Sequence, residues 1–360
     1  MAEIESGLLT EYISHPGDTL IELLEQYGIS QKELAVKTDT SEKHINEIIK
    51  GKKGISVSFA KKLEDVLPPS ASFWINRQNI HDEKLEEIRN IRNITDKEKD
   101  LVKRFPVKEL VKYGYIKEDK DDISNVLALR KFASTINLEF VPIILNVILP
   151  QVNFKLDNST SIDEYHLYSW LRICQIETEN MNNPYPYDVN KLKESILEIK
   201  KCSLEKDFNI TYQKVSEILK KCGVNFKIVK NLKSNPVQGY IRIINNNVSM
   251  CVTLKWHYED VFWFTLFHEI GHLLTKRNNR IFVDFTSSEF KANEFAKNTL
   301  ISKSSWYELL SKPLSETRIK ECAKSNSVCP AVIVGRLKKE GHISYNDNSY
   351  NHLQRMIDLY

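Results

Sequence analysis

The sequence predicts an α+β protein with helices along its first 222 residues and a small β-sheet packed on a metal-binding helix. Three observations predict this fold class. Apolar residues recur every three or four positions up to about residue 222. From residue 224 the apolar period changes to two over three short stretches. A long apolar segment with a His-Glu-x-x-His motif, residues 263–274, follows the third stretch.

The composition is that of a globular chain of 360 residues, long enough for two or three domains, with 41% hydrophobic and 28% charged residues. The net charge is +3, so any nucleic-acid contact has to come from a local patch. We expect a soluble cytoplasmic protein with no membrane association, because no signal-peptide pattern is present and no apolar run approaches the roughly 20 residues that span a bilayer. The cysteines lack Cys-x-x-Cys spacing and are predicted to be reduced packing residues. They are Cys174, Cys202, Cys222, Cys251, Cys322 and Cys329.

Residues 15–80 are predicted to form four short helices. Ser30 is the expected N-cap of the second helix, with Glu33 completing a capping box. Ser41 is the expected N-cap of the third, after a turn at Asp39. Two short helices joined by a tight turn are the helix-turn-helix motif, whose second helix enters the major groove of DNA. The second and third helices of this chain match that pattern.

Exposed polar residues on and around the third helix are the candidate DNA contacts. Asparagine can bond an adenine edge, and lysine can reach guanine or phosphate. A glutamine at the start of the preceding helix suits a phosphate contact. A solvated lysine face on a small helical bundle would show the same charges, so both interpretations stay open at this point. The candidate residues are Gln31, Ser41, Lys43, His44, Asn46, Lys50, Lys52 and Lys53.

Four stretches carry a resemblance to a known family. They are His15-Pro16-Gly17, Gly28-Ile29-Ser30-Gln31-Lys32-Glu33-Leu34-Ala35, Ser41-Glu42-Lys43-His44-Ile45 and Ser72-Phe73-Trp74-Ile75-Asn76. Through them, residues 15–85 resemble the HigA antitoxins of the XRE-type helix-turn-helix class. The resemblance implies binding to operator DNA, as a homodimer. The expected protein partner is either a protein substrate or a cognate toxin. Asp39 stands where the family usually has glycine, and Asp tolerates the left-handed backbone conformation better than most residues.

The middle of the chain carries no chemical motif. Residues 82–125 are densely charged and are predicted to form a long charged helix and a turn that connect two domains. A semi-rigid connection is expected, because the stretch is not rich in Gly, Ser or Pro. Residues 126–222 are predicted to be mostly helical. The predicted domains are residues 1–85, the charged connector and helical middle region 86–204, and the C-terminal domain 205–360.

Three strands are predicted at residues 226–229, 239–243 and 249–254, from their alternating apolar pattern and the turn residues between them. We expect these strands to form a meander that leads directly into the His-Glu-x-x-His helix.

That helix has the residues of a zinc site. His268 and His272 are four residues apart, so a helix points both imidazoles toward one metal ion. Glu269 lies one step round, within reach of a water on the metal without binding the metal. Neutral nitrogen ligands, an open position and a carboxylate base are what a zinc hydrolase needs. A buried helix with two hydrogen-bonded core histidines would carry the same motif, but Gly271 argues against it. Glycine inside a helix costs about 1 kcal/mol relative to alanine, and a close approach by another backbone or a substrate would explain that cost.

A third protein ligand is expected downstream, where Asp284, Glu289 and Glu294 are the candidates. Residues 287–301 are predicted to be helical, and Glu289 falls on the apolar face of that helix while Glu294 falls opposite. A carboxylate on an apolar face needs a partner, and a metal is such a partner. Glu289 is therefore the predicted third ligand. A carboxylate placed at a helix N-terminus by the helix dipole is the alternative.

A second resemblance covers residues 205–340. It is carried by Phe262-Trp263-Phe264, His268-Glu269-Ile270-Gly271-His272, Glu289-Phe290-Lys291-Ala292-Asn293-Glu294-Phe295-Ala296 and Val332-Ile333-Val334-Gly335-Arg336-Leu337. These segments resemble the ImmA/IrrE family of metallopeptidases. The resemblance implies a zincin-like domain with a gluzincin-like site, in which His268, His272 and Glu289 bind Zn²⁺ and Glu269 is the catalytic base. Family members often cleave a DNA-binding repressor. Ser302 stands where the family commonly has proline.

Together these features predict a DNA-binding transcriptional regulator fused to a zinc-dependent endopeptidase, which cleaves a repressor or another regulatory protein. His257 and Tyr258 are the nearby candidates for stabilising the oxyanion. The alternative is a non-enzymatic, antitoxin-like repressor whose zinc domain acts as a sensor or partner-binding module. The combination of Glu269 with three ligands favours the enzyme, because a retired site would have no reason to keep that carboxylate.

Overall fold

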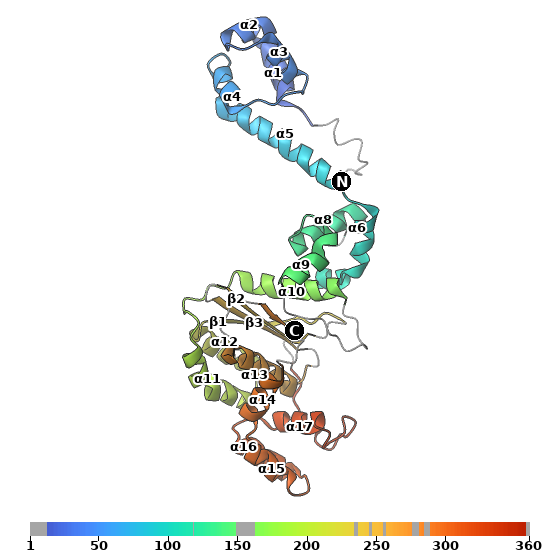
Figure 1. The fold of residues 1–360 in the computed structure, drawn as a ribbon, viewed down its shortest axis with the longest axis vertical. Helices are drawn as coiled ribbons and strands as arrows, with labels where there is room; N and C mark the ends of the chain where they lie inside the picture. Colours follow the sequence, from blue (N-terminus) through green and yellow to red (C-terminus); the bar gives the residue numbers. More distant parts are fainter. Residues whose placement is uncertain are drawn as a thin grey trace. The chain divides into compact units, whose positions relative to one another are not determined.

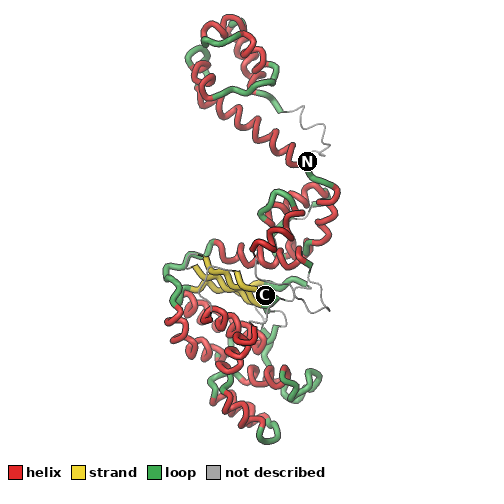
Figure 2. Tube along the Cα trace, viewed as in Figure 1, coloured by secondary structure: helices red, strands yellow, loops and turns green. Residues whose placement is uncertain are grey.

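The computed structural model describes residues 13–117, 119–148, 163–233, 237–244, 247–254, 257–275, 281–283 and 289–357, with backbone alone at 275, 281–283 and 289. The chain divides into two compact units, residues 1–96 and 97–360 (Figures 1 and 2). The larger unit contains both the helical middle region and the C-terminal region, which are predicted from the sequence as separate segments.

The smaller unit is all helical in its described part. Ser30 Oγ accepts a hydrogen bond from Glu33 N (3.1 Å), and Ser41 Oγ accepts one from His44 N (3.2 Å), so both predicted N-caps are confirmed. Asp39 has φ 47°, the left-handed conformation expected of it in the turn. The helices are α1 (Pro16–Tyr27), α2 (Gln31–Lys37), α3 (Glu42–Ile49), α4 (Val57–Glu64) and α5 (Ala71–Arg92).

The N-terminus of α1 packs closely against the end of α3. A Cβ on Gly17 would lie 2.2 Å from the carbonyl oxygen of Ile48, so only glycine fits there. His15 caps α1 by accepting a hydrogen bond from Gly17 N (2.9 Å), and the Asp18 carboxylate accepts one from His15 N (2.8 Å). The buried core beneath consists of Leu20, Leu24, Leu34, Ala35, Ile45, Ile48, Ile55, Phe59, Ala60, Leu63, Leu67, Ala71 and Trp74.

The charged connector contains several helices instead of one. The long charged helix is α5, which begins before the predicted stretch and ends at Arg92. In the larger unit, buried Glu98 accepts hydrogen bonds from Arg130 Nε (2.7 Å) and Leu138 N (2.9 Å), which ties three segments together. The helices before the sheet are α6 (Asp96–Leu101), η1 (Val102–Arg104), α7 (Val107–Lys112), α8 (Asp122–Ala133), η2 (Leu138–Phe140), α9 (Val141–Ile148), α10 (Glu164–Glu179), α11 (Val189–Lys201), η3 (Cys202–Leu204) and α12 (Phe208–Lys221).

The sheet has four strands in the order β1-β3-β2-β4: β1 (Val224–Val229), β2 (Gly239–Ile244), β3 (Asn247–Thr253) and β4 (Ile281–Val283). The three predicted strands are confirmed, but the predicted meander is wrong. β2 and β3 form an antiparallel hairpin, and β1 pairs in parallel with the far side of β3. An alternating pattern identifies a strand and its buried face without identifying its neighbours, and the three-residue β4 is too short to show such a pattern.

Helices cover both faces of this sheet (Figure 1). On one face α10 packs through Trp170, whose ring lies 6.3 Å from that of Tyr240 on β2. On the other face Tyr212 of α12 packs on Phe226 of β1, with ring centroids 5.8 Å apart. The motif helix α13 (Glu259–Thr275) contacts β2 and β3, and α14 (Glu289–Leu300), α15 (Lys303–Leu310), α16 (Glu316–Ser325), α17 (Pro330–Lys339) and η4 (Asn351–Leu353) follow it.

All six cysteines are buried and form no disulfide, as predicted for packing thiols. Among the described residues no single helix has the length and hydropathy of a membrane span, although Asp122–Ala133 and Leu138–Ile148 pass that test together as a pair bent by 42°.

Candidate metal centre and nucleic-acid interface

His268 and His272 lie together on one face of α13. Their Nε2 atoms are 3.0 Å apart, and the side chains are only 6% and 5% exposed. His268 Nδ1 lies 3.1 Å from Asn293 Oδ1 on α14. An amide oxygen can only accept, so Nδ1 carries the proton in this contact, and a neutral His268 then has its lone pair on Nε2, the atom nearest His272. Metal-bound histidines are commonly held in this way by an acceptor on the other ring nitrogen.

Gly271 is explained by the contact between α13 and α14. A Cβ on Gly271 would lie 3.1 Å from Phe295 Cδ1 and 3.2 Å from the Cα of Ala292. The backbone of α14 is thus the close neighbour that the sequence led us to expect. This close packing brings Asn293 within hydrogen-bonding distance of His268.

Glu269 is 2% exposed and lies against the start of β2. A Cβ at Gly239 would lie 1.7 Å from Glu269 Oε1, so the glycine leaves the space that this carboxylate occupies. No pattern in the sequence indicated that Gly239 is a site residue. Its role depends on a contact between two elements thirty residues apart.

His268 and His272 offer two donor atoms of the kind that zinc binds. Among the described side chains no group of three His, Cys, Asp or Glu residues converges, but Asp284 and the side chain of Glu289 lie outside the described part of the chain. The backbone places Glu289 one turn before Asn293, on the face of α14 that meets His268. Glu294 is half-buried and accepts a hydrogen bond from Asn298 (3.3 Å). The two imidazoles on α13, together with a glutamate at position 289 of α14, are a donor set that suits zinc.

His257 and Tyr258 are not placed to stabilise an oxyanion at His268. Tyr258 precedes His268 by ten residues, or about 15 Å of helix. It pairs instead with Met356 in an isolated β-bridge, and the His257 carbonyl accepts a hydrogen bond from Ile357 N (2.6 Å). The C-terminal segment therefore folds back onto the start of α13.

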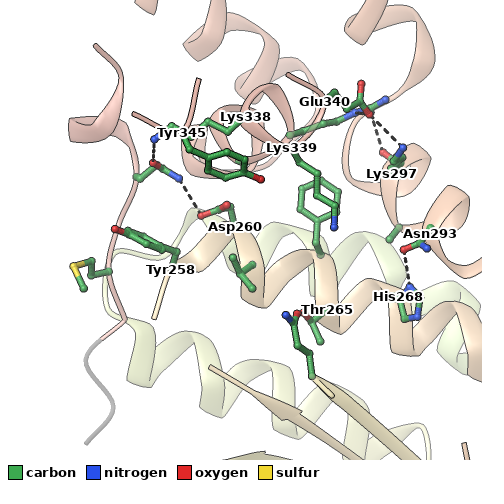
Figure 3. A pocket seen from close by; sticks show the side chains of 18 of the residues that line it. Tyr258, Asp260, Thr265, His268, Asn293, Lys297, Lys338, Lys339, Glu340 and Tyr345 are labelled. Carbon is green, nitrogen blue, oxygen red and sulfur yellow. Dashed lines mark hydrogen bonds and ion pairs between the residues drawn. The ribbon is translucent and has the colours of Figure 1, made fainter. Parts of the chain in front are cut away.

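A pocket of about 820 Å³ extends along α13 from His268 to this C-terminal segment (Figure 3). Gln238, Thr265 and Asn293 lie near His268, and Val261 and Phe264 line its middle. At the far end are Tyr258, Asp260, Lys338 and Tyr345, and Lys339 lies between them and His268.

A hydrogen-bonded chain forms the far end of the pocket. Lys338 is 7% exposed, and its ammonium donates to Asn351 Oδ1 (2.7 Å) and to Gln354 Oε1 (2.8 Å). Gln354 Nε2 in turn donates to Asp260 Oδ1 (3.3 Å). Burial is the main cause that raises the pKa of Asp260 to about 6. A Cβ on Gly335 would lie 2.1 Å from Asp260 Oδ2, so α17 approaches α13 closely at this point.

In the smaller unit, the candidate DNA contacts gather around the exposed side of α3. Lys43, Lys50 and Lys52 are exposed, and Asn46 Nδ2 lies 3.5 Å from Gln31 Oε1 of α2. The candidate face therefore includes residues of both motif helices. Acidic residues share it, because Glu42 and Glu47 line the same shallow concavity as Lys43, Asn46, Lys50 and Lys52.

Three of the candidate contacts also have partners inside the unit. Lys53 forms a 2.7 Å ion pair with Glu47, and the hydrogen bond from Lys53 holds the pKa of Glu47 below its ordinary value. The ring of His44 packs edge-on against Phe59, with centroids 5.2 Å apart. Ser41 is the N-cap of α3, so its oxygen already accepts one hydrogen bond.

The geometry of α2 and α3, two short capped helices joined by a left-handed turn, defines a helix-turn-helix domain. A family model described as helix-turn-helix matches residues 20–72. Virulence-associated protein A of Dichelobacter nodosus is 41% identical over 66 residues, which are 18% of this chain and 65%, just under two thirds, of that protein. Virulence-associated protein I of the same organism is 35% identical over 74 residues, which are 20% of this chain and 68% of that protein. Through its N-terminal part, the chain belongs to the helix-turn-helix family.

Two solved structures are also similar to part of the chain. Pseudomonas aeruginosa antitoxin HigA with the higBA promoter is 29% identical and covers 23% of this chain and 97% of its own, with a TM-score of 0.22. An addiction module antidote protein of a HigA family from Coxiella burnetii is 24% identical and covers 23% and 96%, with a TM-score of 0.21. Each of these matches involves less than a quarter of the chain.

Proposed function

We propose that this protein is a DNA-binding transcriptional regulator whose larger unit is a zinc-dependent endopeptidase that acts on another regulatory protein. The helix-turn-helix domain with its exposed polar face on α3 supports the DNA-binding half. The two histidine Nε2 atoms 3.0 Å apart, with Asn293 on the other nitrogen of His268, support the peptidase half.

In the DNA-binding half, α3 enters the major groove. Asn46 and Lys43 face the base edges, while Lys50 and Lys52 at the end of α3 face the phosphates. Glu42 and Glu47 on the same face repel phosphates, which favours the correct register over non-specific binding.

The test of this half is titration of the full-length protein with DNA from upstream of its own gene, over a range of salt concentrations. Specific binding that weakens steeply with salt is expected, and Asn46→Ala should reduce the preference for that DNA over random DNA by about 1–3 kcal/mol. Equal affinity for both DNAs at every salt concentration would remove the operator proposal.

In the peptidase half, His268, His272 and Glu289 hold zinc. A bound zinc ion lowers the pKa of water and polarises a carbonyl group. Glu269 takes the proton of the attacking water and delivers it to the leaving amine. Asn293 fixes the ring of His268, and Gly239 leaves the space in which the Glu269 carboxylate sits.

Glu269→Gln tests the peptidase half. The amide cannot accept the proton, so cleavage should fall by roughly 10²–10⁴-fold, while zinc content and DNA affinity stay unchanged. Glu294→Gln on α14 is the matched control and should keep cleavage. The measurement uses a reporter strain with equal amounts of each protein and an immunoblot of the candidate regulator. If both versions control the reporter equally and the regulator stays intact, the antitoxin-like repressor with a non-enzymatic zinc domain replaces the peptidase.

A further inference from the structure

The pocket beside His268 has the length of a short peptide segment. Val261, Thr265 and His268 line it from one face of α13, and Val261 lies seven residues before His268. Seven residues of helix span about 10 Å. An extended peptide advances about 3.3 Å per residue, so the far end of the pocket begins about three residues from a bond held at His268.

The far end of the pocket offers hydrogen-bond donors. An ammonium group has three N–H donors, and Lys338 uses two of them on Asn351 and Gln354, which leaves one for an occupant. Lys339 is exposed and has no acidic partner among the described residues. Figure 3 shows Lys338 and Tyr345 together at this end, with Lys339 between them and His268.

The charge of the pocket lining is positive. Its acidic members are already engaged: Glu340 pairs with Arg336 (3.0 Å) and Lys297 (3.4 Å), and Asp260 accepts the hydrogen bond from Gln354. Lys339 and the third N–H of Lys338 therefore remain for an external anion. The apolar middle of the pocket, with Val261 and Phe264, favours a peptide over a small inorganic ion.

We propose that Lys338 and Lys339 bind an acidic side chain of the protein substrate, within about three residues of the cleaved bond. The position relative to that bond rests on the proposed peptidase function, whereas the binding of an acidic peptide does not. The pocket thus selects substrate segments that carry Glu or Asp at this distance.

A binding experiment with the full-length protein tests the site itself. The probes are three fluorescein-labelled twelve-residue peptides that differ only in a central pair, Glu-Glu, Gln-Gln or Lys-Lys. They are titrated against zinc-loaded Glu269→Gln protein, so that cleavage does not consume them. The Glu-Glu peptide should bind about five- to tenfold more tightly than the Gln-Gln peptide, and the Lys-Lys peptide most weakly.

Lys339→Glu should abolish or reverse this preference, because it replaces the exposed cation with an anion. Lys312→Glu is the matched control, since Lys312 is exposed outside the pocket. Equal binding of the three peptides, or a preference that survives Lys339→Glu but not Lys312→Glu, would overturn the proposal. So would a single-stranded oligonucleotide that binds more tightly than the Glu-Glu peptide and depends on Lys339, because it would make the pocket a nucleic-acid site.

A cleavage experiment distinguishes the acidic-peptide site from the proposed peptidase function. Wild-type protein with zinc is incubated with a mixed peptide library, and the cleaved bonds are mapped by mass spectrometry. Enrichment of Glu and Asp within about three residues of the cleaved bond, lost in Lys339→Glu, is the expected result. Cleavage without that enrichment would overturn the acidic subsite and leave the peptidase standing. Acid-selective binding without any cleavage would overturn the peptidase and leave the binding site standing.

Discussion

The α3 surface and the α13 site differ first in exposure. Lys43, Lys50 and Lys52 are exposed to solvent, whereas His268 and His272 are 6% and 5% exposed. They differ also in sequence span: the α3 candidates fall within residues 31–53, while the α13 site joins residues from 239 to 293. An exposed, local site depends on its side chains, and a buried site depends also on the packing that brings its elements together. Substitutions should therefore separate affinity from folding at α3 far more cleanly than at α13.

The largest effect is expected where the buried site loses its ligands. The double substitution His268→Ala and His272→Ala removes two of three predicted zinc ligands, so zinc content should fall from about one ion per chain to none. Metal analysis of the purified protein measures it. Glu294→Ala is expected to keep its zinc, and metal loss there would mean that Glu294, not Glu289, is the third ligand. Full zinc occupancy in the double variant would refute the metal site.

Two glycine substitutions compare stability and cleavage in the two units. Gly17→Ala places a Cβ 2.2 Å from a backbone oxygen of Ile48, which cannot move by itself. The expected loss is about 1–3 kcal/mol of unfolding free energy in the smaller unit. Gly239→Ala places its Cβ 1.7 Å from a carboxylate at the end of a flexible side chain. Glu269 can rotate away, so this variant should lose cleavage with a smaller loss of stability.

Urea unfolding followed by circular dichroism, together with the cleavage assay, distinguishes the two glycine variants. Gly28→Ala provides a comparison, because a Cβ there meets nothing within 4 Å and the cost comes only from the left-handed backbone at φ 64°. Equal stability of Gly17→Ala and wild type would show that α1 and α3 can separate at little cost.

The difference between local and long-range contacts also explains which features could be predicted from the sequence. In the smaller unit, Ser30, Ser41 and Asp39 act on their own helix ends and turn, so local patterns were sufficient to locate α2 and α3. The alternating stretches located β1, β2 and β3 in the same way. The strand order was not predictable, because it depends on which strand edges meet.

The surroundings of the α13 histidines were harder to predict for the same physical reason. Spacing along one helix was enough to pair His268 with His272. The roles of Asn293 and Gly239 arise from contacts between separate elements, although Asn293 lay within the stretch that resembles the metallopeptidases. The C-terminal segment is fixed by still longer contacts, such as the 2.8 Å ion pair between Arg355 and Glu259. Polar composition alone gave no sign of that docking.

An effect of similar size, but one that depends on pH, is expected from the buried acid in the pocket. The pKa of Asp260 is raised from its ordinary value of 3.8 to about 6, mainly by burial. A carboxyl group whose pKa is higher in the folded state than in the unfolded state keeps its proton to higher pH when the protein is folded. Its ionisation therefore lowers the free energy of unfolding as the pH rises from about 4 through about 6. Asp260→Asn removes that titration and should gain up to about 3 kcal/mol over wild type above pH 6, with little difference below pH 4.

The difference in urea midpoint between Asp260→Asn and wild type, followed from pH 4 to pH 8, measures this effect. Asp347→Asn is the control with the opposite sign. Hydrogen bonds from Ser349 lower the pKa of Asp347, so its removal should cost stability at neutral pH instead of adding it. A constant difference between Asp260→Asn and wild type across the whole range would mean that Asp260 does not titrate in this window.

The smallest expected effect compares two adjacent lysines after α3. Lys52 is exposed and has no acidic partner among the described residues, whereas Lys53 lies 2.7 Å from Glu47. Each phosphate that a lysine neutralises contributes about 0.9 to the slope of log affinity against log salt. Lys52→Ala should therefore reduce that slope by about one. Lys53→Ala should change the slope less, because Glu47 already offsets the Lys53 charge. In that variant Glu47 faces the DNA without its lysine partner. Salt titrations of both full-length variants on the same DNA provide the measurement, with Lys84→Ala on α5 as the control. Equal slopes for both variants would show that DNA breaks the Lys53–Glu47 pair, so that even the exposed site is rearranged when it binds.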